Sequence, residues 1–214
     1  MTQDVDSISG KSFSVGLWVY RRRVGVGEYL LSQGVNLPMK RLTLRVNNDV
    51  LEVTFYNEHT TTSTYGSDIH TWVHLGLTFD KETLAMKIYK AGLAQVLDNG
   101  NLYKTASGTT SASGPIYLGV HKWDTAHQPF NGKLDELRVY GRALSQLEVS
   151  LMMTNPTTDD LGLVLSMTFD GSGGDLGKDS SCRGVGDATS VTAVSVTGKE
   201  CGSVDSSALI SCNR

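Results

Sequence analysis

A period of two between apolar and polar residues constrains the fold of this chain more than any other feature of its sequence. In the segment from residue 13 to residue 19, every second side chain is large and apolar: Phe13, Val15, Leu17 and Val19. The same pattern or a similar apolar run recurs over residues 42–46, 51–55, 73–79, 86–89, 116–120 and 137–139. Successive side chains of a strand point to opposite faces of a sheet, so this period predicts strands with one buried face. Asn47-Asn48-Asp49 predicts a tight turn that makes the second and third segments a hairpin.

One short helix is expected near residues 145–153. Ser145 is followed three residues later by Glu148, which forms a capping box, and Leu144 and Val149 can pack around it as a hydrophobic staple. Many antiparallel strands with a single late helix predict an all-β protein, an antiparallel two-sheet β-sandwich.

Length and charge narrow the class of protein. The chain has 214 residues, enough for one full sandwich, and its 19 Lys and Arg against 22 Asp and Glu leave a net charge of -3. We therefore expect no nucleic-acid partner, and we interpret the basic run Arg21-Arg22-Arg23 as a solvated loop. No apolar run approaches the roughly 20 residues that span a bilayer, so no membrane insertion is expected.

Cysteine content points to an extracellular or cell-surface location. Cys182, Cys201 and Cys212 lie in a polar C-terminal segment, and their spacing matches no zinc motif. Three cysteines allow at most one disulfide, which fits a local cross-link formed in an oxidising compartment. No signal peptide is visible, and Met1 is followed directly by Thr2-Gln3-Asp4, which indicates an expressed fragment or an artificial start.

Four segments occur in an order that resembles a known family. They are Phe13-Ser14-Val15-Gly16-Leu17-Trp18-Val19, Thr71–Asp80, Met86-Lys87-Ile88-Tyr89 with Ala91-Gly92, and Phe130–Tyr140 with Arg142-Ala143-Leu144-Ser145. Together they are similar to a laminin-G-like jelly-roll module of the concanavalin A-like lectin/glucanase superfamily. The resemblance covers residues 13–153 and implies a sandwich that binds a ligand.

The opening strands of such a module are missing before residue 13. Matching segments appear after the helix instead, as Gly162–Asp170, Asp179-Ser180-Ser181 and Thr197-Gly198-Lys199. The chain therefore holds either a truncated module and the start of a second one, or a sandwich closed in permuted order. A missing strand would leave backbone unpaired and apolar surface exposed, so we expect residues 1–155 to form the sandwich and residues 156–214 to complete it. A domain-swapped dimer would fill the same gap.

Asp135 is the first candidate for a metal site. It shares strand parity with Leu137, so we expect its carboxylate on the core side, where it needs a cation or hydrogen-bond donors. The family resemblance implies a structural calcium ion near this position, and calcium takes six to eight oxygen ligands. The ligands implied are Asp135, Asp170, the backbone around Gly132, and Asp179. Hydrogen bonding to loop amides or to Arg138 is the alternative.

A histidine- and tryptophan-containing segment is the candidate ligand site. An exposed Trp with polar neighbours can stack on a sugar ring and bond its hydroxyls. The predicted ligand-binding residues are His121, Trp123, Asp124, His127, Tyr65 and His59. A tryptophan tucked into the rim of its own sandwich is the alternative. His70 and His74 lie on one predicted strand about 13 Å apart, too far to share a zinc ion, and are expected at the surface or edge.

The sequence favours a binding module over an enzyme. It lacks the Glu-x-Asp-x-Glu strand of laminarinase-type hydrolases and any Gly-x-Ser-x-Gly elbow. Asp68-Ile69-His70 and Tyr89-Lys90-Ala91-Gly92 echo jelly-roll alginate lyases, but Glu136-Leu137-Arg138 follows them where the lyases' arginine strand comes first. We expect non-catalytic carbohydrate recognition within a larger extracellular or cell-surface protein. The alternative is a protein-binding adhesion module with an extracellular protein partner; a polysaccharide lyase or glycoside hydrolase is less favoured.

Overall fold

A computed structural model describes residues 8–34, 37, 40–55, 58–62, 65–66, 68–121, 128–154 and 161–170, together with four short strands after residue 189. For residues 55, 58–61 and 128 and for those four strands, the description is limited to the backbone.

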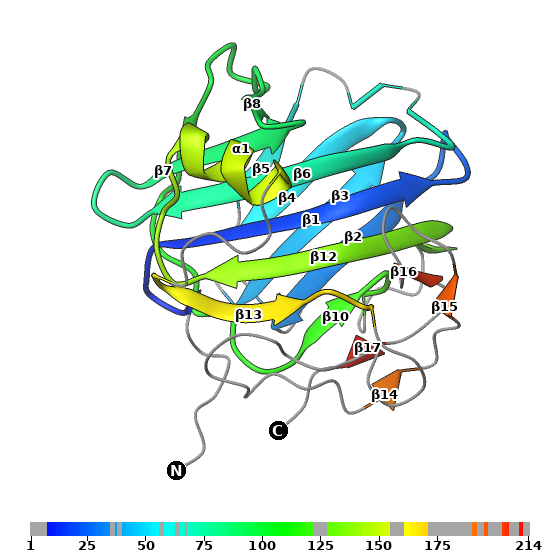
Figure 1. Ribbon diagram of the computed structural model, residues 1–214. Helices are drawn as coiled ribbons and strands as arrows, with labels where there is room; N and C mark the ends of the chain where they lie inside the picture. Colours follow the sequence, from blue (N-terminus) through cyan, green and yellow to red (C-terminus); the bar gives the residue numbers. More distant parts are fainter. Residues whose placement is uncertain are drawn as a thin grey trace.

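Two β-sheets stack face to face, as Figure 1 shows. Sheet A contains β1 (Phe13–Arg21), β6 (Trp72–Asp80), β7 (Ala85–Lys90), β8 (Leu93–Ala94), β9 (Lys104–Thr105), β12 (Gly132–Tyr140), β13 (Leu163–Met167), β15 (Ser195–Val196) and β16 (Ser203–Asp205). Sheet B contains β2 (Glu28–Gly34), β3 (Arg41–Asn47), β4 (Val50–Phe55), β5 (Glu58–Thr61), β10 (Ile116–Leu118), β11 (Gln128–Pro129), β14 (Ser190–Val191) and β17 (Ile210–Ser211). Apart from the parallel pair of β11 and β2, the ladders are antiparallel, which confirms the predicted jelly-roll sandwich.

The alternating residues form the core between the sheets. Val15, Leu17 and Val19 of β1 lie in one cluster with the alternating leucines and valines of β3, β4 and β6. The predicted hairpin is also present: β3 pairs with β4, and Asn48 and Asp49 have φ angles of 47° and 63°. Positive φ at both central residues is what the tightest hairpin turns require.

Strand β2 was not predicted, and its local geometry explains why. A register shift between Tyr29 and Leu31 interrupts its pairing with β3. As a result Leu30 and Leu31 are both buried, although they are neighbours in the sequence. A β-bulge removes the strict period of two on which the prediction depends.

Helix α1 (Gln146–Thr154) covers the outer face of sheet A. Gly16 of β1 pairs with Gly76 of β6, and because neither residue has a side chain the helix packs close to the sheet here. A Cβ atom on Gly16 would lie 2.3 Å from Met152 Cε, and one on Gly76 would lie 3.0 Å from Val149 Cγ1. The helix also buries His74, which is 1% exposed and contacts the Trp18 ring edge-on at 5.4 Å. The expectation of a surface histidine at position 74 was wrong, because Met152 of α1 covers the outer face of the sheet beside His74.

The predicted capping box is confirmed. The Ser145 amide donates to Glu148 Oε2 at 2.7 Å, and the Glu148 amide donates to Ser145 Oγ at 3.3 Å. Leu144 and Val149, the predicted staple, are both buried in one small cluster on this face.

Replacing Ser145 with alanine is expected to lower the free energy of unfolding by about 1 kcal/mol, because the Glu148 amide loses its acceptor. Urea denaturation followed by circular dichroism measures this loss. A Ser145→Asp variant, which keeps an acceptor at the cap, should stay close to wild type. Equal losses in the two variants would show that the cap hydrogen bond does not stabilise the helix.

Strand β13 lies beside β12 at the lower side of sheet A in Figure 1. Leu165 and Met167 of β13, and Phe169 just after it, belong to the main core. Beyond residue 189, β16 pairs with β12 and β17 pairs with β10. That residues 156–214 as a whole complete this sandwich stays a prediction.

The three cysteines lie outside the described residues. No helix among the described residues has the length and apolar character to span a membrane.

Candidate functional site

The predicted sugar-binding segment is described only in part. Trp123, Asp124 and His127 lie outside the described residues, and His59 is placed only by its backbone in β5. His121 stacks on the Tyr29 ring, with centroids 4.7 Å apart and planes inclined by 29°. One face of the imidazole therefore already has a protein partner.

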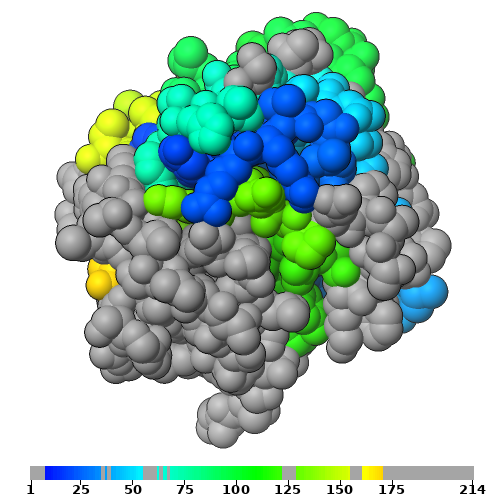
Figure 2. All heavy atoms as spheres, turned by 90° about the vertical axis from the view of Figure 1, so that its right-hand side faces the viewer, coloured from blue at the N-terminus to red at the C-terminus, as the bar shows by residue number. Residues whose placement is uncertain are grey.

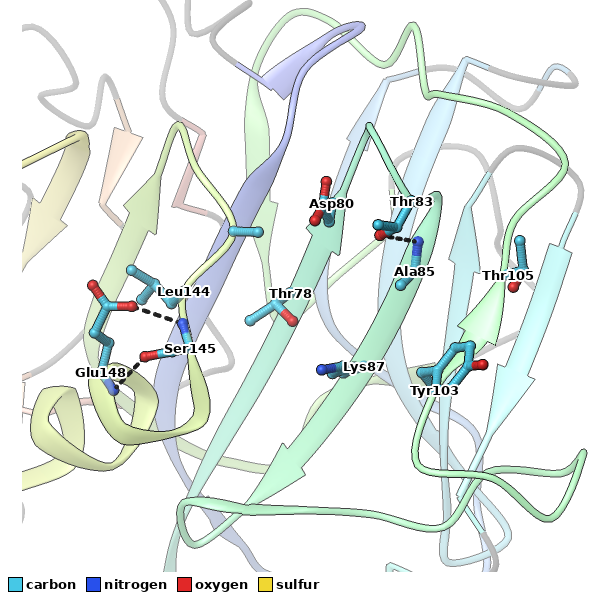
Figure 3. A pocket seen from close by; sticks show the side chains of 11 residues that line it. Thr78, Asp80, Thr83, Ala85, Lys87, Tyr103, Thr105, Leu144, Ser145 and Glu148 are labelled. Carbon is cyan, nitrogen blue, oxygen red and sulfur yellow. Dashed lines mark hydrogen bonds between the residues drawn. The ribbon is translucent and has the colours of Figure 1, made fainter.

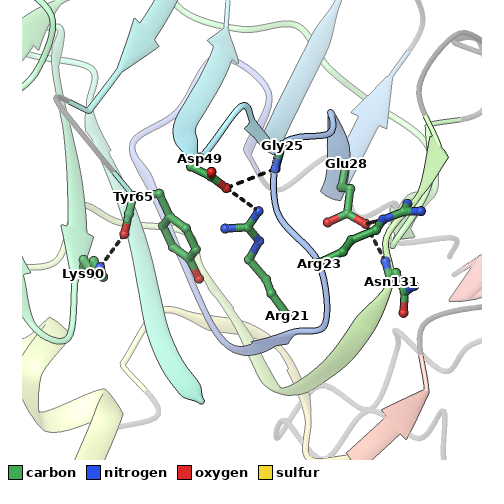
Figure 4. A network of polar contacts seen from close by, with 8 residues as sticks. All are labelled: Arg21, Arg23, Gly25, Glu28, Asp49, Tyr65, Lys90 and Asn131. Atoms are coloured by element: carbon green, nitrogen blue, oxygen red, sulfur yellow. Dashed lines mark hydrogen bonds and ion pairs between the residues drawn. The ribbon is translucent and has the colours of Figure 1, made fainter. Parts of the chain in front are cut away.

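Tyr65 does not line a surface site. Its side chain is 1% exposed and lies between Lys90 and Arg21, as Figure 4 shows. The Lys90 ammonium and the Arg21 guanidinium each lie 5.0 Å from the centre of the ring. Burial raises the pKa of Tyr65 well above its ordinary value, so the phenol is neutral. The prediction that Tyr65 contacts a ligand was wrong, because two cations hold it inside the sandwich.

The basic run at the end of β1 is likewise not a solvated loop. Arg21 is fully buried, and its Nη2 donates to Asp49 Oδ1 at 3.0 Å. Arg23 Nε donates at 2.5 Å to Glu28, which is also fully buried and accepts the Asn131 amide at 2.8 Å. This end of the sandwich faces the viewer in Figure 2, where the N-terminal part of the chain, in blue, lies at the surface. These charges link β1, β2 and the β3–β4 turn, so we interpret them as structural.

The expected orientation of Asp135 was also wrong. Asp135 pairs with Trp18, whereas Val139 pairs with Val15, and the register shifts between these pairs. Glu136 has a φ angle of 52° at this shift. The bulge places Asp135 on the outer face with Trp18, away from the core face that Leu137 occupies. Its Oδ1 accepts the amide of Glu136, the next residue of β12, at 2.9 Å.

The predicted calcium ligands are described only in part. Asp170 is exposed, Gly132 pairs with Arg21 in the ladder, and Asp179 lies outside the described residues. No three His, Cys, Asp or Glu side chains of the described residues gather closely enough to hold a metal ion. The calcium site implied by the family resemblance, built from carboxylates and backbone carbonyls, stays a prediction.

A polar groove lies on the outer face of sheet A, beside the start of α1 (Figure 3). Its volume is about 670 Å³, within the range that holds a small organic ligand. The floor comes from alternate residues of β6 and β7 and from the turn between them: Thr78, Asp80, Thr83, Ala85 and Lys87. Tyr103 and Thr105 line one side of the groove, and the other side is lined by Ala143, Leu144, Ser145 and Glu148.

Several polar side chains of the groove are already bonded within the protein. Glu148 caps α1 and accepts Arg142 Nη1 at 2.5 Å, and Asp80 accepts the Glu82 amide at 2.9 Å. Although burial acts to raise the pKa of Glu148, its hydrogen bonds with Ser145 and the Arg142 guanidinium outweigh burial and lower it. Tyr103, in contrast, exposes 49% of its surface beside this polar floor. The groove thus presents an aromatic ring and hydroxyl groups together.

The sequence analysis missed this groove. The alternation in β6 and β7 placed Thr78 on the outward face but could not show that the face borders a hollow. Tyr103 reaches the groove because β9 pairs with β7, with Ala85 opposite Thr105. The two-residue strand β9 is too short to give a periodic signal.

Comparison with known proteins is consistent with this architecture. The laminin-G model of the concanavalin A-like lectin/glucanases superfamily matches residues 1–150. No match was found among curated proteins. A candidate carbohydrate-binding protein from Bacteroides ovatus is similar in structure, with a TM-score of 0.61 and 21% identity over 82% of this chain and 50% of the other. This chain thus spans half the length of that protein.

Two further structures share the fold. The CBM40 module of the Ruminococcus gnavus IT-sialidase, bound to α2,3-sialyllactose, has a TM-score of 0.53 and 16% identity over 70% of this chain and 90% of the module. An SAP-like pentraxin from Limulus polyphemus has a TM-score of 0.51 and 15% identity over 66% of this chain and 69% of the other. With its family model matched over most of its length, the chain belongs to the concanavalin A-like lectin/glucanase superfamily.

Proposed function

We propose that the chain is a non-catalytic carbohydrate-binding module of a larger extracellular or cell-surface protein, with the groove beside α1 as its binding site. The observation that carries this proposal is the exposed ring of Tyr103 beside a floor of hydroxyl and charged groups. A pyranose has apolar faces and polar edges, so it can stack on such a ring while its hydroxyls bond the floor. The Bacteroides ovatus protein and the CBM40 module, whose names describe carbohydrate binding, support this proposal through the fold that they share with the chain.

The state of the groove carboxylates favours binding over catalysis. Glycoside hydrolysis uses two carboxyl groups, one of which is a general acid with a raised pKa. The pKa of Glu148 is lowered instead, and its carboxylate is occupied by the helix cap and by Arg142. Asp80 is engaged by the backbone of the following turn. Neither side chain is therefore arranged as a general acid.

A glycan-array screen of the full chain, run in calcium and again with a chelator, tests the proposal. Selective binding of a glycan supports it, and failure to bind any glycan in both buffers contradicts it. Loss of binding with the chelator would support the predicted calcium dependence. The array should also include a Trp123→Ala variant, because the segment with Trp123, Asp124 and His127 is the other proposed site.

Replacing Tyr103 with alanine is expected to weaken binding of the selected glycan by about tenfold, because the sugar loses its stacking partner. Isothermal titration calorimetry measures the dissociation constant. Tyr103→Phe keeps the ring and should bind within about threefold of wild type. If Trp123→Ala abolishes binding while Tyr103→Ala leaves it unchanged, the groove is not the site.

Protein-mediated adhesion is the second candidate function. Leu147 and Leu151 lie one turn apart on α1 and are 69% and 41% exposed, and Leu93 of β8 is 63% exposed. Exposed apolar side chains of this kind favour a protein partner. If no glycan binds, this surface is the next to test.

A further inference from the structure

We propose that the groove selects acidic saccharides, and that Lys87 binds their carboxylate or sulfate group. This inference rests on the proposed function, since it names the class of glycan that the same groove takes.

Lys87 lies at the centre of the groove floor. Its neighbours Met86 and Ile88 point into the core, so the Lys87 side chain points outward. Thr78 lies directly opposite on β6. On the other side Met86 pairs with Lys104, which places Lys87 next to Tyr103, and Figure 3 shows its amine among these side chains.

The charge of Lys87 is not matched within the described part of the chain. No carboxylate oxygen of the described residues lies within 4.0 Å of its ammonium, and the side chain is partly buried. Neighbouring cations are paired: Arg142 with Glu148 at 2.5 Å, and Lys104 with Asp98 at 3.3 Å. A partly desolvated ammonium without a counter-ion favours an anionic ligand, which gains a charge-assisted hydrogen bond.

The two carboxylates that line the groove do not oppose this assignment. The charge of Glu148 is balanced by Arg142, and Asp80 lies opposite Ala85, one outward position along the sheet from the pair of Thr78 and Lys87. We therefore place the acidic group of the sugar at Lys87, with its ring on Tyr103. A neutral sugar would bond the same hydroxyls but would leave the ammonium without its counter-ion.

The test is a glycan array of matched pairs, in which each uronate, sialate or sulfated glycan is accompanied by its neutral counterpart. Wild-type protein is expected to bind acidic members at least tenfold more tightly, and binding should weaken as salt rises. For the best glycan, Lys87→Met should raise the dissociation constant about tenfold or more and reduce the salt dependence, while Lys87→Arg should stay within a few-fold of wild type. Lys133→Met is the matched control, because Lys133 lies over the Tyr20 ring outside the groove and its loss should leave binding unchanged.

The outcomes separate this inference from the proposed function. Equal binding of acidic and neutral members, weakened by Tyr103→Ala, would overturn the selectivity and keep the glycan site. Acidic binding that Lys87→Met does not weaken would also overturn it. Binding of no glycan would contradict both proposals. An unchanged midpoint of thermal unfolding for Lys87→Met ensures that a loss of binding does not reflect misfolding.

Discussion

Replacing Phe169 with alanine is expected to lower the free energy of unfolding by about 3–5 kcal/mol, a large part of the total stability of a single domain. The ring is 2% exposed and packs in the main core just beyond β13, with Leu165 and Met167. Its removal would leave a cavity that the two rigid sheets cannot close.

Urea denaturation measures this effect, and Leu161→Ala is the matched control. Leu161 lies in the same segment but is 68% exposed, so its loss should change stability by less than about 0.5 kcal/mol. Similar small losses in both variants would mean that the segment after α1 is not part of the cooperative unit. A midpoint that depends on protein concentration would indicate the domain-swapped dimer instead.

Replacing Arg138 with methionine is expected to lower the free energy of unfolding by about 3–5 kcal/mol. Arg138 pairs with Glu136 at side-chain exposures of 4% and 9%, and its Nη1 donates to the Met152 carbonyl at 3.2 Å in the last turn of α1. The substitution leaves a buried carboxylate without its guanidinium and removes a donor from the helix end. Thermal and urea unfolding both measure the loss.

A double variant identifies the cause of that loss. Glu136→Gln combined with Arg138→Met removes both charges, so it should be markedly more stable than Arg138→Met alone. If the double variant instead loses as much stability as Glu136→Gln and Arg138→Met lose together, the ion pair contributes nothing beyond packing. Arg142→Met is the comparison, because Arg142 precedes α1 and pairs with Glu148 of the helix at side-chain exposures of 27% and 35%. This more exposed pair should contribute no more than about 1 kcal/mol.

The sequence by itself determined the strands, the turn and the helix start that depend on contacts between residues close together in the chain. The alternation from Phe13 to Val19, the turn at Asn48 and Asp49, and the capping box at Ser145 each depend on residues a few positions apart. Their interactions are formed within one strand, one turn or one helical turn. Motif order added the superfamily, because the closing segment from Phe130 to Ser145 is long and specific.

Tertiary structure alone decided which faces are covered and where bulges reverse them. A period of two shows that Asp135 and Leu137 share a parity, but the bulge at Glu136 separates them. Periodicity likewise placed His74 on an outward face and Tyr65 in a polar loop, yet a helix covers the first and two cations enclose the second. The groove around Lys87 arises where α1 leaves sheet A uncovered. Local periodicity tells which side chains share a face, whereas burial of that face depends on contacts between segments far apart in the chain.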